Sequence, residues 1–144
     1  MNRAQVVAAV RGWIGTPYQH QQRLKGVAVD CAGLVIGVAR ELEIVSADFD
    51  VTGYLRVPDG QSLLAYCDQF MTRIPLSEAL PGDVVVVCFP RSRSRHAAHM
   101  GIFGDYPSGG LSLIHANGTK VVEHRFDEDT RSRTLQVYRM PGVE

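Results

Sequence analysis

The stretch Pro81-Gly82-Asp83-Val84-Val85-Val86-Val87-Cys88-Phe89 decides the class of fold. Pro-Gly-Asp is a turn sequence, and the β-branched valines that follow it favour an extended backbone. A valine run with no alternating polar residues is typical of a strand that is buried on both faces. We therefore predict a fully buried strand over residues 84–89.

The residues after this stretch continue as strands. Four further segments are expected to be extended, at about 99–104, 111–116, 119–125 and 134–139. Asn117-Gly118 lies between two of them and is a strong hairpin signal. The C-terminal half is therefore predicted to form an antiparallel sheet.

The residues before the valine run have apolar residues at helical spacing. Three helices are predicted, from a cap at Asn2 to about Trp13, from Asp30 or Cys31 to about Leu42, and over about residues 61–72. Helices followed by an antiparallel sheet define an α+β protein, with N-terminal helices packed on a C-terminal β-sheet. Gly33 and Gly37 in the second helix indicate that another element packs closely there, because glycine destabilises a helix.

Length and charge narrow the class of protein. The 144 residues fit a single domain over residues 1–144, with no segment that resembles a linker. Fifteen basic residues balance fifteen acidic ones, so charge points neither to nucleic acid nor to an anionic membrane. The first residues lack the layout of a secretory signal, and no run approaches the roughly twenty apolar residues of a membrane span. We expect a protein that is cytoplasmic when synthesised.

The three cysteines, Cys31, Cys67 and Cys88, form no Cys-X-X-Cys pair. In a reducing compartment the expected state is three free thiols. Cys67 falls on the apolar face of the third predicted helix and Cys88 in the valine strand, so both are expected to serve in packing. No cofactor is expected.

Cys31 differs from the other two because it is predicted to begin a helix. A thiol is a useful nucleophile only as the thiolate, and the unpaired N–H groups at a helix N-terminus favour negative charge. The carboxylate of Asp30 would oppose ionisation if it pointed at the sulfur, so we expect it to face the backbone or a cationic substrate group. The prediction is a Cys31 sulfur held ionised at the start of the helix.

Two histidines lie on segments that are predicted to pair. His99 begins the segment 99–104, and His115 lies near the end of 111–116. If these strands form a hairpin, both imidazoles can lie close together on one face. His99 would then act as base and later as acid, while His115 orients it. The other histidines, His20, His96 and His124, are expected at the surface, although His20, in the loop near Tyr18, could contact substrate.

Four segments occur in a fixed order along the chain. They are Trp13-Ile14-Gly15-Thr16-Pro17-Tyr18, Asp30-Cys31-Ala32-Gly33-Leu34, His99-Met100-Gly101-Ile102-Phe103 and Ile114-His115-Ala116. In this order they resemble the motifs of NlpC-type cell-wall peptidases, which are papain-like cysteine hydrolases of bacterial peptidoglycan. The Gly-Thr-Pro-Tyr start is most similar to the branch encoded by tailed phages and prophages.

The resemblance implies a papain-like fold and a role for each matching residue. It makes Cys31 the nucleophile, His99 the base and His115 the third, polar catalytic member. The implied activity is that of a cysteine endopeptidase that cleaves peptidoglycan stem peptides, with the γ-D-glutamyl–diaminopimelate bond as target. Phage tail proteins are the implied partners, and the virion tail is an implied location.

The resemblance also implies residues that contact the substrate. Tyr18 matches a tyrosine near the oxyanion, and Asp30 matches an aspartate that receives the free amine of the stem peptide. Ala32 stands where the family usually has a serine, which removes a hydroxyl from the substrate side. Gln19-His20-Gln21 replaces the usual Trp-Gly-Gly.

The residues leave other hypotheses open. A zinc site of Cys31, His99 and His115 has suitable ligand types but no closely spaced ligand pair. A tail-assembly module could keep the fold with little chemistry, and an amidase or acyltransferase could use the same nucleophile. A basic loop precedes His99 and is most simply a solvated connection, although it could contact the anionic wall polymer. Its basic residues are Arg91, Arg93 and Arg95.

Overall fold

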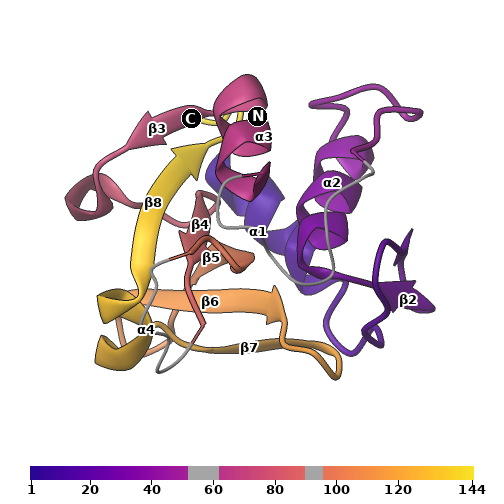
Figure 1. Ribbon diagram of the computed structural model, residues 1–144. Coiled ribbons are helices and arrows are strands. Elements are labelled where there is room, and N and C mark those ends of the chain that lie inside the picture. Colours follow the sequence, from indigo (N-terminus) through magenta and orange to yellow (C-terminus); the bar gives the residue numbers. More distant parts are fainter. Residues whose placement is uncertain (52–61, 90–95) are drawn as a thin grey trace.

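The computed structural model describes residues 1–51, 62–89 and 96–144. Figure 1 shows the helices gathered beside an antiparallel sheet that the C-terminal half of the chain forms. The predicted α+β class, with N-terminal helices packed on a C-terminal antiparallel sheet, is confirmed. The basic loop with Arg91, Arg93 and Arg95 lies outside the described residues.

Three helices lie in the described residues before the sheet. They are α1 (Arg3–Arg11), α2 (Cys31–Glu41) and α3 (Ser62–Phe70). The Asn2 side chain caps α1 as predicted, accepting a hydrogen bond from the Gln5 N–H (2.9 Å). The helix ends earlier than predicted, with Gly12 as its C-cap. No described helix combines the length and the apolar character that crossing a bilayer requires.

The main sheet has six strands in the described part of the chain, each antiparallel to its neighbours. In spatial order they are β3 (Thr72–Ile74), β8 (Thr134–Arg139), β4 (Val84–Val87), β5 (His99–Asp105), β6 (Leu111–Ala116) and β7 (Val121–Arg125). The predicted hairpin at Asn117-Gly118 joins β6 to β7. The Asn117 side chain accepts hydrogen bonds from the N–H groups of Thr119 and Lys120, so β7 begins later than predicted.

The short strand β2 (Ala28–Val29) lies within Val27-Ala28-Val29, which the sequence predicts to be extended. The other short elements were not predicted, namely β1 (Arg23–Leu24), β3, the 3-10 helix η1 (Leu76–Glu78) and the helix α4 (Glu128–Ser132). Each has at most five residues, which is too few to show a hydrophobic period. Only α4 had a local sequence signal, because Asp127 is a typical N-cap residue. Its carboxylate accepts the Thr130 N–H (2.8 Å).

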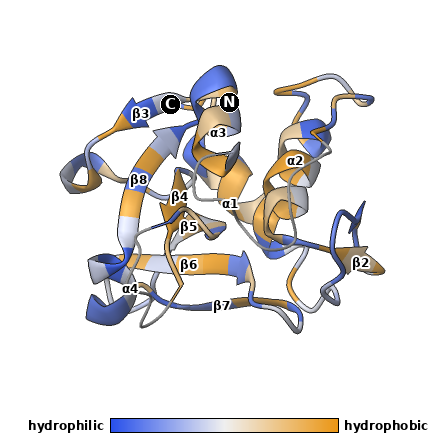
Figure 2. Ribbon diagram, in the orientation of Figure 1, coloured by the Kyte–Doolittle hydropathy of each residue, from blue (hydrophilic) through white to orange (hydrophobic). Residues whose placement is uncertain are grey.

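The valine strand β4 separates two layers of core. Val84 and Val86 face the helices, whereas Val85 and Val87 face a second cluster on the other side of the sheet. All four are buried, which confirms the prediction of a strand buried on both faces, but the strand ends at Val87 instead of Phe89, and Phe89 is exposed. Figure 2 shows the hydrophobic colour along β4, β6 and α1.

Both glycines of α2 allow another element to approach the helix, as predicted. A Cβ on Gly37 would lie 2.4 Å from Cη2 and Cζ2 of the Trp13 indole. A Cβ on Gly33 would lie 2.3 Å from the backbone oxygen of Gln22. The ring of Trp13 and the loop that precedes α2 therefore rest directly on the helix backbone.

A buried carboxylate ties the two ends of the chain to the turn before β4. Asp83 is 0% exposed and accepts two hydrogen bonds from Arg139, at 3.0 and 2.9 Å, and one from Arg3 at 3.0 Å. The termini lie next to each other in Figure 1, and the Glu144 N–H donates to the Met1 oxygen (3.0 Å).

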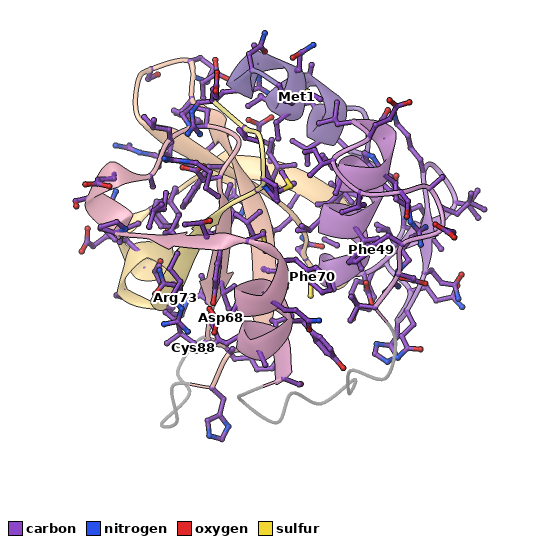
Figure 3. All side chains as sticks on the ribbon, turned by 90° about the horizontal axis from the view of Figure 1, so that it is seen from above. Met1, Phe49, Asp68, Phe70, Arg73 and Cys88 are labelled. Carbon is purple, nitrogen blue, oxygen red and sulfur yellow. The ribbon has the colours of Figure 1, made fainter. Side chains whose placement is uncertain are left out.

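The helix α3 is fastened to the sheet by polar and aromatic contacts. Asp68 accepts hydrogen bonds from the Tyr138 hydroxyl (2.8 Å) and from Arg73 (2.6 and 2.8 Å). These bonds lower the pKa of Asp68 to about 2. Phe70 packs edge-on against Phe49 at 4.8 Å, which joins α3 to the loop after α2 (Figure 3).

Candidate active site

One cleft contains all the residues that the sequence predicts to take part in catalysis or to contact the substrate. It has a volume of about 280 Å³ and lies between the first turn of α2, the start of β5 and the end of β6. In Figure 1 the arrowhead of β6 lies below the lower end of α2, and the two elements are in contact. The predicted residues that line it are Tyr18, Asp30, Cys31, Ala32, His99 and His115.

Cys31 is the first residue of α2, as predicted. The helix begins there because the Asp30 carboxylate caps it, accepting the Gly33 N–H (2.7 Å). The backbone N–H groups of Met100, Ala32 and Cys31 itself are directed at the sulfur and favour the thiolate. Since Met100 follows His99 in β5, the sulfur lies beside the strand that carries His99.

The ionisation state of Cys31 differs from the prediction. Burial, together with the neighbouring charge of Asp30, raises the pKa of the Cys31 thiol to about 11. The three backbone N–H groups act in the opposite direction but are outweighed. The prediction of an ionised sulfur is therefore wrong for the resting protein, in which Cys31 is a neutral thiol at pH 7.

The Asp30 side chain faces the backbone, which is one of the two orientations expected for it. Its second oxygen accepts the Gln21 N–H (2.7 Å), and the residue is 1% exposed. His20 Nδ1 lies 3.8 Å and Arg23 Nη1 4.0 Å from the carboxylate oxygens. His20, expected at the surface, therefore lies near Asp30 and lines the cleft.

His99 and His115 are directly hydrogen-bonded. His99 Nε2 lies 2.7 Å from His115 Nδ1, and the two rings meet edge to face. This confirms the prediction that pairing of their strands brings the imidazoles together. Gly101 makes the approach possible, because a Cβ at that position would lie 3.0 Å from the His115 Cβ.

Both histidines are held in the neutral form. Burial lowers the pKa of His99 to about 4, and the positive charge of Arg133 acts in the same direction. Burial also lowers the pKa of His115 to about 3, with further contributions from His99, His124 and Arg133. A neutral thiol therefore shares the cleft with neutral imidazoles, and a base with an available lone pair is present at pH 7.

Comparison with known proteins identifies solved structures that share this fold. No protein-family model and no curated protein sequence matches the chain. Among solved structures, NlpC2 from Trichomonas vaginalis matches with a TM-score of 0.66 and 20% identity, covering 96% of this chain and 46% of that one. The NlpC/p60 domain of the peptidoglycan hydrolase SagA matches with a TM-score of 0.61 and 25% identity, covering 97% of this chain and 100% of that one.

This is the NlpC/p60 fold. The chain spans less than half the length of NlpC2 but the whole of the SagA domain. A similar architecture occurs in an N-acetylmuramoyl-L-alanine amidase from Bacteroides uniformis, with a TM-score of 0.58 and 14% identity, covering 96% of this chain and 98% of that one. In this chain the NlpC/p60 fold places Cys31 on the first helix turn after the β1–β2 hairpin and the histidines on the sheet.

The structure adds His124 to the site. His124 Nε2 lies 2.7 Å from His115 Nε2, and His124 Nδ1 lies 2.9 Å from the Arg125 carbonyl oxygen. His124 is exposed, as expected, but it also lines the cleft. The sequence could have predicted this position of His124. The hairpin places His115 opposite Val122, and His124, two residues after Val122, lies on the same face of the sheet as His115.

Arg133 is the second residue that the sequence analysis missed. It follows α4, lines the cleft, and donates to the Cys88 carbonyl (2.8 Å) and to Asp129 (3.3 Å). Its charge disfavours protonation of His99 and His115. No sequence pattern pointed to it, because its position depends on the short helix α4.

Cys67 and Cys88 are buried and, like Cys31, are free thiols. Among the residues that the structure describes, no three His, Cys, Asp or Glu side chains form a group that could hold a metal ion. The zinc hypothesis placed a metal between Cys31, His99 and His115. Both ring nitrogens of His115 instead face neighbouring imidazoles at 2.7 Å.

Proposed function

We propose that this protein is a cysteine endopeptidase that hydrolyses peptidoglycan stem peptides, with the γ-D-glutamyl–diaminopimelate bond as its target. The proposal rests on one observation. Cys31 lines the same cleft of an NlpC/p60 fold as His99 and His115, which are hydrogen-bonded to each other. A thiol, a base and a group that orients the base are the parts that nucleophilic acyl transfer requires.

The reaction begins from the neutral pair. As the Cys31 sulfur attacks the amide carbonyl, its proton passes to His99, and a carbon–sulfur bond forms. His99 then gives this proton to the leaving amine as the carbon–nitrogen bond breaks, which leaves a thioester. Water, deprotonated by His99, attacks the thioester, releases the carboxylate product and restores the thiol.

The oxyanion of the tetrahedral intermediate needs hydrogen-bond donors. In our proposal the Cys31 backbone N–H supplies one of them, and the Tyr18 hydroxyl, which lines the same cleft, assists it. Both belong to fixed elements: Cys31 starts α2, and the Tyr18 backbone N–H donates to the Thr119 carbonyl (2.9 Å).

The substrate class rests on chemistry beside the nucleophile. Asp30 is buried next to Cys31 and carries a negative charge that a free stem-peptide amine would complement. SagA, which shares the fold and 25% of aligned residues, is a peptidoglycan hydrolase. Ala32 leaves the substrate side without a hydroxyl, and this favours close contact with an apolar part of the peptide.

We further propose that the protein is synthesised in the cytoplasm and reaches the wall as part of a phage tail, with tail proteins as partners. The support is the similarity of Gly15-Thr16-Pro17-Tyr18 to the branch that tailed phages encode. Co-purification of the protein with intact virions tests this, and its absence from purified tails would contradict it.

Digestion of purified muropeptides, read by mass spectrometry, tests the catalytic proposal. Wild type should split the γ-D-glutamyl–diaminopimelate bond, and Cys31→Ala should not. Cys67→Ala is the matched control, because it removes a thiol that packs in the core and lies outside the cleft lining. If Cys31→Ala digests as fast as wild type, the nucleophile is wrong, and products cut at the muramoyl–L-alanine bond would identify an amidase instead.

A further inference from the structure

Three histidines form a continuous hydrogen-bonded chain that ends on a backbone carbonyl. The chain runs from His99 through His115 to His124 with ring nitrogens 2.7 Å apart at each step. It ends where His124 Nδ1 meets the Arg125 carbonyl oxygen at 2.9 Å. The proposed mechanism uses His99 and His115 but gives no part to His124.

The carbonyl at the end determines which nitrogen of every ring carries a proton. A carbonyl oxygen only accepts, so His124 must donate from Nδ1, and an imidazole with a single proton then accepts at Nε2. His115 must therefore donate from Nε2 and accept at Nδ1. By the same rule His99 donates from Nε2, so its lone pair lies on Nδ1.

This assignment concerns the base of the proposed reaction. Among the described residues, no hydrogen bond engages His99 Nδ1, and His99 and Cys31 line the same cleft. A lone pair on Nδ1 can take the thiol proton, whereas the opposite tautomer would present an N–H there and could not act as base. The burial of His99 keeps the ring neutral, so its tautomer decides whether it can act.

We propose that His124 is a positioning residue that selects the Nε2–H tautomer of His99, through His115, from an anchor on the Arg125 carbonyl. The inference rests on the proposed function for its catalytic meaning, but the tautomer itself can be measured without any substrate. His124 lies on the edge strand β7 and is exposed, so it can be replaced with little effect on the core.

The first test is the protonation of the ring nitrogens in wild type, read from 15N chemical shifts of labelled histidine at pH 7. His99 should carry its proton on Nε2 and show a bare Nδ1. A wild-type His99 with its proton on Nδ1 would overturn the proposal, whatever activity the protein has. This measurement depends neither on the substrate nor on the folding of a variant.

The second test uses two variants of similar length and opposite hydrogen-bonding character. The carboxylate of His124→Glu can only accept, which preserves the direction of the chain, whereas the ammonium of His124→Lys can only donate, which reverses it. We expect kcat/KM on muropeptides to stay within about threefold of wild type for Glu and to fall at least roughly tenfold for Lys. His124→Leu, which neither donates nor accepts, should lie between them.

A merely structural role for His124 would affect the variants alike, so equal rates for Glu, Leu and Lys would refute the proposal. His96→Leu is the control, since it removes an exposed histidine that does not line the cleft. The His99 15N shifts of each folded variant should follow its rate. If wild type shows the expected tautomer but digests no muropeptide, the function proposed above fails while the assignment of His124 stands.

Discussion

As the pH falls, the free energy of unfolding should first decrease because of the histidines in the cleft. Most carboxylates take up protons only at lower pH. The pKa of His99 is about 4 in the folded protein, against about 6.5 in an unfolded chain. The unfolded state therefore binds more protons than the folded state between these values, and the free energy of unfolding falls as the pH falls through this window. Above about pH 6.5 the contribution of His99 to the free energy of unfolding is complete, and near pH 4 this contribution is lost.

The size of the effect follows from the two pKa values. For one group shifted from about 6.5 to about 4, the whole linkage is about 3 kcal/mol, of which about 2 kcal/mol is lost between pH 7 and pH 5. These are upper values, because His99 is partly exposed and solvent screens its charge. The lowered pKa of His115 adds a loss of the same sign.

Urea denaturation at pH 7, 6 and 5 measures this loss. The free energy of unfolding of wild type should fall steeply over the range, and that of His99→Asn should fall less. His96→Asn is the matched control, since it makes the same substitution at an exposed histidine outside the cleft. The same slope in His99→Asn and in wild type would refute the reasoning, because it would mean that His99 is not held neutral by burial.

Three further predictions concern the packing that supports the site. Gly37→Ala should cost about 2 kcal/mol and shift the fluorescence of Trp13, the only tryptophan, because the new methyl group overlaps its indole. Asp83→Ala should cost about 3 kcal/mol in urea denaturation, since it removes the buried carboxylate on which two arginines meet. Tyr138→Phe should cost about 1 kcal/mol and raise the pKa of Asp68 in an NMR titration, because the hydroxyl is one of its hydrogen-bond donors.

The local sequence pattern was sufficient to predict the elements that form the core. The valine run of β4 and the Asn117-Gly118 turn both encode their structure in consecutive residues, so the strand and the hairpin were predictable. The segments β1, β3 and α4 are too short to show a period, and contacts with other segments fix them. Their omission mattered little for the fold but concealed Arg133, which α4 delivers to the cleft.

The sequence predicted where the residues of the site lie better than it predicted their charges. Strand pairing alone brought His99 and His115 together, because register is a property of the hairpin. The charge on Cys31 was not predictable in this way. A helix N-terminus favours the thiolate, but the sulfur is also removed from water, and this second effect depends on elements that close over the site from elsewhere in the chain.

The neutral state of the cleft gives the histidine chain its significance. In a resting thiolate–imidazolium pair both nitrogens of His99 would carry protons, and no neighbour would need to choose between tautomers. Here burial keeps Cys31 protonated and His99 neutral, so the proton must move during attack and needs the lone pair of His99 Nδ1, the ring nitrogen that is not bonded to His115. Because burial keeps the thiol neutral, the reactivity of Cys31 depends on the tautomer of His99. The direction of the hydrogen bonds that end at the Arg125 carbonyl sets this tautomer.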